Sequence, residues 1–267
     1  MILRFPRSLW LHRELFLRLT EREVLGRYRG SFLGIGWSFV TPMAMLAVYT
    51  FIFSQVFKAR WVGLGDSGPL EFAVNLFAGL IVFNLFSECV SRAPGLILAN
   101  PNYVKKVIFP LELLGCVAVG SAGFHAFTSL AILVLFELLA FKGLHISFIW
   151  LPLVWLPLFL GSLSFTWLLS AAGVFLRDIS QVIGVGLNML MFLSPIFFPI
   201  SGLPKQWQPL LNINPLAQVI EQTRKVTVQG VGPSPTYLII GIASSLVACE
   251  VTFRIFQKSK RAFADVI

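Results

Sequence analysis

Few residues in this chain could carry chemistry, and most of those that could lie inside long apolar stretches. Glu88 is followed four residues later by Arg92, and Glu250 is followed four residues later by Arg254. On a helix this spacing pairs an acid with a base. Because ionised side chains are costly inside a membrane, the two pairs indicate either a charged collar at the mouth of a channel or charge neutralisation near lipid headgroups. The second interpretation is slightly favoured.

Two more ionisable side chains lie in one apolar stretch. His125 lies near its middle, where a lone histidine indicates a packed, hydrogen-bonded ring more often than a proton relay. Glu137 lies near its outer end, where we expect the carboxylate to reach water. These residues do not form the chain of membrane carboxylates that is typical of an ion-coupled pump.

Motifs for nucleotide binding, hydrolysis and metal binding are missing from the sequence. It contains no GxxxxGK[ST] phosphate loop, no HExxH and no GxSxG, and its three histidines have no metal-ligand spacing. Any use of ATP would therefore need a partner subunit. The three cysteines, Cys89, Cys116 and Cys249, lie in apolar stretches without CxxC spacing, so we expect buried free thiols.

An aromatic side chain recurs every four residues at Tyr49, Phe53 and Phe57. This spacing puts the three rings on one face of a helix. One interpretation is a track along which the apolar faces of sugar rings slide. The favoured alternative is packing within a helix bundle or against lipid.

The composition indicates an integral membrane protein. Of 267 residues 57% are hydrophobic and 12% are charged, against about 25% charged residues in a typical soluble domain. So few charges exclude a soluble enzyme, a nucleic-acid-binding domain and a disordered chain. The net charge of +9 therefore indicates Lys and Arg on cytoplasmic loops rather than a nucleic-acid partner.

Six apolar stretches are long enough for helices that cross a hydrocarbon core of about 30 Å. They are residues 33–57, 72–90, 113–141, 148–173, 182–200 and 237–256. Pro195 and Pro199 predict that the fifth is kinked or broken at its end. With six spans both termini lie on one side, where 15 of the 21 Lys and Arg residues fall, against 6 on the other. This bias predicts that both termini are cytoplasmic.

Two segments outside the spans have apolar faces of their own. Residues 1–30 are predicted to form a cytoplasmic amphipathic interface helix, with Leu11, Leu15 and Leu19 on one face, and the alternative is a water-exposed tail. Gly30 and Gly34 favour a bend before the membrane domain, residues 31–267. Residues 201–236 are too apolar for a free loop and too broken to span, so we expect a re-entrant helical segment before the last span.

Four motifs in this order resemble the permease subunit of ABC transporters that export polysaccharides, the O-antigen, capsule and teichoic-acid group. They are RYRGSFLGIGWSFVTP at 27–42, NPNYVKKVIFP at 100–110, FLRDI at 175–179 and SPIFFP at 194–199, followed by Asn214-Pro215 and Glu221. The resemblance covers nearly the whole chain. The family usually has asparagine where this chain has Thr41 before Pro42.

This resemblance implies a transport subunit without catalytic residues, an all-α protein of the cytoplasmic (inner) membrane. Two copies form a channel and pair with two cytoplasmic ATPase subunits, which bind ATP and Mg²⁺. The segment at about 94–103 is similar to the coupling helix that sits in a groove of the ATPase. The coupling residues implied are Pro94, Leu98, Asn100, Pro101 and Tyr103.

The substrate implied is a lipid-linked polysaccharide that arrives from the cytoplasmic leaflet. Basic residues at the inner surface attract anionic groups, so the resemblance suggests four contacts for the lipid pyrophosphate. They are Arg27, Arg29, Lys105 and Lys106. The favoured alternative is that these four residues only reflect the usual positive charge of cytoplasmic loops.

Three other functions remain open at this point. An ABC permease for a drug or a lipid would have the same fold. An ion-coupled secondary transporter would need ionisable groups at the membrane midplane and an internal repeat, neither of which is clear. A membrane transferase would need paired carboxylates or a metal site, and Arg177-Asp178 alone is too little.

Overall fold

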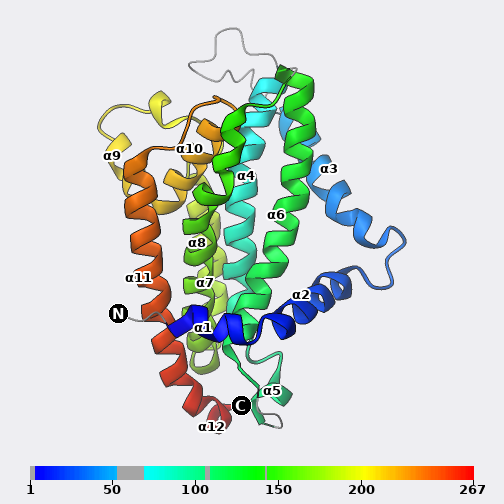
Figure 1. The fold of residues 1–267 in the computed structure, drawn as a ribbon, viewed down its shortest axis with the longest axis vertical. Coiled ribbons are helices and arrows are strands. Elements are labelled where there is room, and N and C mark those ends of the chain that lie inside the picture. Colours follow the sequence, from blue (N-terminus) through cyan, green and yellow to red (C-terminus); the bar gives the residue numbers. More distant parts are fainter. Residues whose placement is uncertain (1–3, 53–68, 106–108, 142) are drawn as a thin grey trace.

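The computed structural model describes residues 4–52, 69–105, 109–141 and 143–267, and within these ranges the chain is helical without strands. Figure 1 shows the helices in sequence order. The α-helices are α1 (Arg4–Leu11), α2 (Arg13–Tyr28), α3 (Trp37–Phe51), α4 (Pro69–Arg92), α5 (Pro101–Lys105), α6 (Glu112–Phe141), α7 (Leu151–Phe175), α8 (Ile179–Phe192), α9 (Gln208–Ile213), α10 (Pro215–Thr227), α11 (Pro235–Ser259) and α12 (Phe263–Val266). Short 3₁₀ turns are η1 (Gly34–Gly36), η3 (Ala93–Gly95), η4 (Ile146–Trp150), η5 (Ile200–Gly202) and η6 (Lys260–Ala262).

Five helices in these ranges are long and apolar enough to cross a membrane. They are Gly34–Phe51, Glu71–Gly95, Glu112–Leu139, Ile146–Phe175 and Pro235–Val266. The fifth predicted span forms only α8, whose 14 residues rise about 21 Å, short of a core of about 30 Å. The helix ends at Phe192, before the prolines, so the predicted break is confirmed while a count of six spans stays a prediction.

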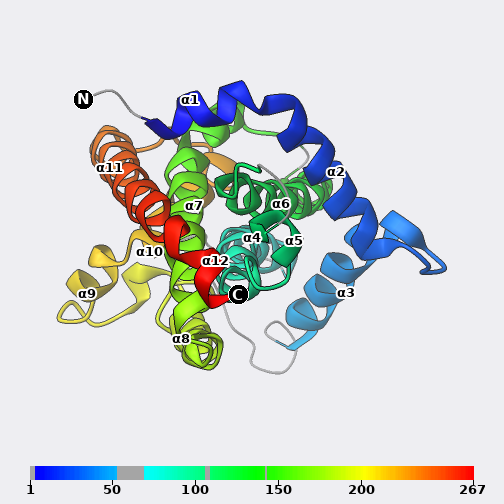
Figure 2. The same ribbon diagram turned by 90° about the horizontal axis from the view of Figure 1, so that it is seen from below.

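The centre of the bundle is α4, which Figure 2 shows enclosed between α6 and α7. Its side chains from Phe72 to Phe83 are all buried, as expected for a helix that is apolar on every side. It also packs against α3, α8 and α10. By contrast α3 stands at the edge of the bundle, and most of its apolar side chains are exposed.

The N-terminal segment is two helices rather than one. It breaks at His12, and α1 and α2 lie across the bundle near the end that carries α5 and α12, which we name the terminal end (Figure 1). Of the predicted apolar face, Leu19 is buried, Leu15 is half-buried and Leu11 is exposed. The prediction of one continuous amphipathic helix over residues 1–30 is therefore wrong.

Two sharp changes of direction follow the sequence. Gly30 and Gly34 have φ of +85° and +52°, which side chains with a Cβ rarely adopt, so the predicted bend between α2 and α3 is confirmed. The predicted coupling helix is divided into η3 and α5, with a turn between them. Residues 201–236 hold α9, α10 and the start of α11. Helix α10 buries Leu216, Val219 and Ile220 against the bundle, while the re-entrant role stays a prediction.

Candidate functional site

A cavity of about 570 Å³ lies between α3 on one side and α4 and α6 on the other. Arg27 and Tyr28 of α2 line its polar end, and Met191 of α8 touches it from the side. Its outer wall is α3, which stands at the edge of the bundle after the glycine bend. Among the contacts that hold α3 is a hydrogen bond from Thr128 Oγ1 of α6 to the Ser38 carbonyl, at 3.3 Å.

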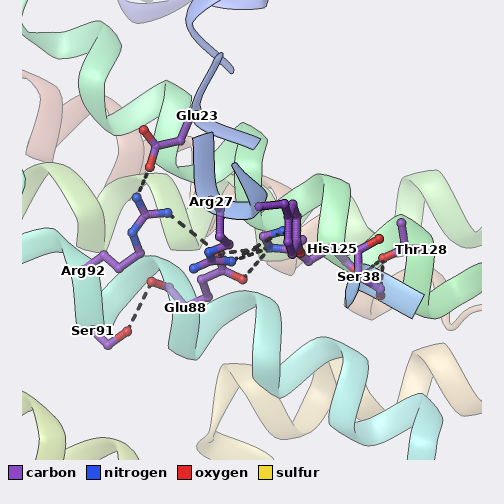
Figure 3. Close-up of polar contacts among 9 residues, drawn as sticks. Glu23, Arg27, Ser38, Glu88, Ser91, Arg92, His125 and Thr128 are labelled. Atoms are coloured by element: carbon purple, nitrogen blue, oxygen red, sulfur yellow. Dashed lines mark hydrogen bonds and ion pairs between the residues drawn. The ribbon is translucent and has the colours of Figure 1, made fainter. Parts of the chain in front are cut away.

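One carboxylate gathers the polar side chains of the cavity, as Figure 3 shows. Arg27 Nη1 of α2 lies 2.7 Å from Glu88 Oε1 of α4. His125 Nδ1 of α6 lies 3.0 Å from Glu88 Oε2, and the Tyr28 hydroxyl lies 3.0 Å from His125 Nε2. Three helices that are distant in the sequence therefore meet at Glu88, a contact that sequence reasoning missed because their separations are 61 and 37 residues.

The cluster continues outward through Arg92. Its guanidinium bonds Glu23 of α2 and lies 3.8 Å from Glu88, so the predicted pairing of Glu88 with Arg92 is confirmed. Burial raises the pKa of the Tyr28 phenol. The phenol can donate a hydrogen bond to His125 Nε2 when that nitrogen carries no proton.

The rest of the cavity wall is mainly apolar. Phe77, Leu80 and Ile81 of α4 face Met45 and Tyr49 of α3 across it. The Tyr49 ring also meets Phe197 edge to face, with ring centroids 6.2 Å apart. The cavity thus combines one guanidinium, paired with a carboxylate, at one end with a mainly apolar and aromatic wall, which suits an amphipathic molecule with a polar headgroup.

The structure brings together only some of the predicted binding residues. Arg27 and Tyr49 line the same cavity, whereas Arg29 and Lys105 are exposed and outside its lining. The positions of Phe53, Phe57 and Lys106 fall outside the described residues. The aromatic track therefore stays a prediction.

The predicted coupling residues lie at the terminal end. Pro94 is buried against Gly173 of α7, so closely that a Cβ on that glycine would stand 2.7 Å from the Pro94 Cα. Asn100 donates to the Leu96 carbonyl at 2.9 Å, and Tyr103 accepts a hydrogen bond from Arg22 of α2 at 3.0 Å. Leu98 and Pro101 are exposed.

Other ionisable residues divide into confirmed and wrong predictions. Arg254 Nε bonds Glu250 Oε1 at 2.7 Å, as predicted, and His125 is hydrogen-bonded rather than free. The expected solvent contact of Glu137 is wrong, because the residue is 1% exposed and both carboxylate oxygens are buried. Neither oxygen has a hydrogen-bond partner within the described part of the chain. All three cysteines are buried and free, as predicted.

Arg224 lies in residues 201–236, for which the sequence analysis expected a re-entrant helical segment, and its side chain is buried. It is 1% exposed and donates to the carbonyls of Pro195, Ile196 and Asn75 at 2.5, 2.7 and 2.9 Å. It thereby joins α10, the broken segment after α8, and α4. The available signal was its place four residues after Ile220, on the apolar face of α10.

Comparisons with known proteins find relatives that match along most of the chain. The ABC-2 type transporter family matches residues 14–228. The chain is 25% identical over 268 residues to the O-antigen export system permease protein RfbA of Myxococcus xanthus, covering 100% of both chains. It is 23% identical over 255 residues to the protein of that name in Klebsiella pneumoniae, covering 95% of both. It is also 27% identical over 245 residues to the polysialic acid transport protein KpsM of Escherichia coli, covering 89% of this chain and 88% of that one.

Proposed function

The chain belongs to the ABC-2 type transporter family, and on that premise we propose that it is the permease subunit of an ATP-driven exporter of a lipid-linked polysaccharide, of the O-antigen type. Relatives that match along nearly the whole chain are named for O-antigen export and polysialic acid transport, and this is the observation that carries the proposal. Such a permease is a transport subunit and not an enzyme.

The proposed assembly has two copies of this chain and two cytoplasmic ATPase subunits in the inner membrane, with both termini cytoplasmic. The ATPase subunits bind ATP and Mg²⁺, because this sequence has no phosphate loop. The segment from η3 to α5 contacts the ATPase and transmits its closure to the bundle. Support for this comes from Tyr103, whose hydrogen bond to Arg22 joins that segment to α2.

The cavity receives the lipid-linked substrate in this proposal. Its cationic end, at Arg27, meets the diphosphate, since guanidinium groups bind phosphate oxygens well. Its apolar wall, including Tyr49, meets the first part of the lipid or of the sugar chain. Glycan passage then follows a channel between two copies, opened by ATP binding in the partner subunits.

Purification and reconstitution test the proposal. The tagged chain is isolated from its native membrane in mild detergent, and co-purifying proteins are identified and quantified by mass spectrometry. We expect a cytoplasmic ATPase at about equal stoichiometry, and in proteoliposomes we expect ATP-dependent movement of a lipid-linked glycan. Recovery of the chain alone, from a preparation in which other membrane complexes stay intact, would contradict the proposal.

A further inference from the structure

Glu88 is the common partner of several donors around the cavity. Its side chain is 19% exposed, and Arg27, His125 and Arg92 all lie within 4 Å of its oxygens. A guanidinium carries five N–H donors, yet the bonds from Arg27 to Glu88 and His125 all leave from the single nitrogen Nη1. One carboxylate therefore engages only part of the donor capacity at this end of the cavity.

The contacts of His125 cannot all be satisfied at once. Its Nδ1 lies 2.9 Å from Arg27 Nη1 and 3.0 Å from Glu88 Oε2. Arginine only donates hydrogen bonds and a carboxylate only accepts them. His125 Nδ1 must therefore lack a proton to accept from Arg27, and it must carry a proton to donate to Glu88. With a proton on Nδ1, Arg27 and His125 both donate to Glu88 and compete for it, and a second anionic acceptor in the cavity would remove that competition.

We propose that Glu88 is a resident counter-ion, which holds the guanidinium of Arg27 while the cavity is empty and is displaced from it by a diphosphate headgroup. This inference rests on the proposed function, because it concerns the same substrate at the same cavity. The incoming diphosphate takes the bond of Arg27 to Glu88 and offers further oxygens to the remaining N–H groups.

Displacement does not leave the carboxylate of Glu88 without a cation. Arg92, one turn further along α4, already lies 3.8 Å from Glu88 Oε1. Its other partner, Glu23, lies outside the cavity lining. A shift of the Glu88 side chain toward Arg92 therefore replaces one guanidinium by another and avoids a buried unpaired charge.

A resident carboxylate gives the cavity a preference between anionic lipids. A phosphodiester lipid carries one negative charge, as Glu88 does. When such a lipid replaces Glu88 beside Arg27, the negative charge facing the guanidinium does not increase. A diphosphate carries more negative charge and more acceptor oxygens than a carboxylate, so its replacement of Glu88 beside Arg27 strengthens both the charge attraction and the hydrogen bonding. Glu88 thus excludes the abundant phospholipids of the surrounding bilayer while it admits a diphosphate-linked lipid.

The test is binding of farnesyl diphosphate to the purified full-length chain in maltoside micelles, measured by microscale thermophoresis. Removing the counter-ion with Glu88→Gln should tighten binding about tenfold. Glu88→Asp keeps the negative charge but, with a shorter side chain, moves it away from Arg27, and it should tighten binding about threefold. This variant provides a second readout where Glu88→Gln folds poorly. Glu21→Gln removes a charge from an exposed site on α2 and should change the affinity by less than about twofold.

The outcomes separate this inference from the proposed function. Arg27→Gln should weaken binding at least about tenfold. Where wild-type binding occurs and depends on Arg27, but Glu88→Gln and Glu88→Asp bind equally or more weakly, Glu88 is a structural ion pair and the counter-ion inference is overturned while the site stands. Absence of wild-type binding, or indifference to Arg27→Gln, overturns both the counter-ion inference and the assignment of this cavity to the diphosphate, whereas the export function is decided by the purification and reconstitution test. A second probe, dihexanoyl phosphatidylglycerol, should bind the wild type at least about tenfold more weakly than farnesyl diphosphate and should gain affinity in Glu88→Gln. Equal wild-type affinity for the two probes overturns the selectivity.

Discussion

Adding one methyl group at Gly173 should separate α7 from the segment that carries the predicted coupling residues. An alanine Cβ there would stand 2.7 Å from the Pro94 Cα and 2.8 Å from its carbonyl carbon, whereas ordinary contacts are 3.4–4 Å. These neighbours are backbone atoms, so no side-chain rotation relieves the overlap. Either η3 or α7 must move by close to 1 Å.

The magnitude follows from the kind of overlap. Overpacking a core with one methylene group costs typically 1–3 kcal/mol, and a contact with buried backbone belongs at the upper end, at about 3 kcal/mol. For a chain of this size that corresponds to a fall in melting temperature of at least about 5 °C. Gly161→Ala, on the same helix, is the matched control because a Cβ there meets nothing within 4 Å. It should leave the melting temperature unchanged or raise it slightly, since alanine favours a helix by about 0.5–1 kcal/mol.

The measurement is thermal unfolding of the purified variants in the same detergent, followed by quantification of the ATPase that co-purifies. Gly173→Ala should lose stability and retain less of the ATPase, whereas Gly161→Ala should match the wild type in both. A Gly173→Ala variant within about 1 °C of the wild type, with full ATPase retention, would refute the close packing of η3 on α7 and the argument built on it.

Three more substitutions test separate parts of the fold by the same unfolding measurement. Arg224→Gln removes the buried guanidinium that donates to three carbonyls and pairs with Glu221, and it should cost about 3–5 kcal/mol. A loss no larger than that of its neighbour Lys225→Gln would contradict the burial of Arg224. Glu137→Leu removes a buried carboxyl whose oxygens are unpartnered within the described ranges and should stabilise the protein by about 1–2 kcal/mol, so destabilisation would show a partner for that group. Trp155→Phe removes the 3.1 Å hydrogen bond from Trp155 of α7 to Thr223 of α10. The loss of this bond should cost about 1 kcal/mol beyond the loss of ring volume. The cost of the bond alone is obtained by comparison with Trp155→Phe made in a Thr223→Val background.

The helical architecture could be predicted from the sequence because each span is a local property. Length and hydropathy suffice for a helix such as α6, which lies close to the predicted 113–141. The same reasoning found the bend at Gly30 and the break before Pro195, since both depend on the backbone of one residue. The same reasoning overestimated how far α8 extends toward the C-terminus, because the predicted span 182–200 included apolar residues beyond that break.

The candidate site was predicted only in fragments because its contacts join distant parts of the chain. Charge alone selected Arg27, and helical spacing paired Glu88 with Arg92, but neither indicates that α2 and α6 meet at Glu88. Glu137 was placed in water for the same reason, since exposure depends on which helices cover a position. Burial of Arg224 follows from the packing of α10 on α4, which no local pattern specifies.

The contacts of α2 show why the predicted coupling segment and the cavity belong to one mechanical unit. Within six residues of this helix, Arg22 bonds Tyr103 in α5, Glu23 bonds Arg92 at the end of α4, and Arg27 bonds Glu88 inside the cavity. A displacement of α5 must therefore either break its bond to α2 or carry α2 with it. If α2 moves, the distance from Arg27 to Glu88 changes directly, because the helix between Arg22 and Arg27 is rigid. The same displacement thus alters the polar end of the cavity, at Arg27, without any need for a change in α3.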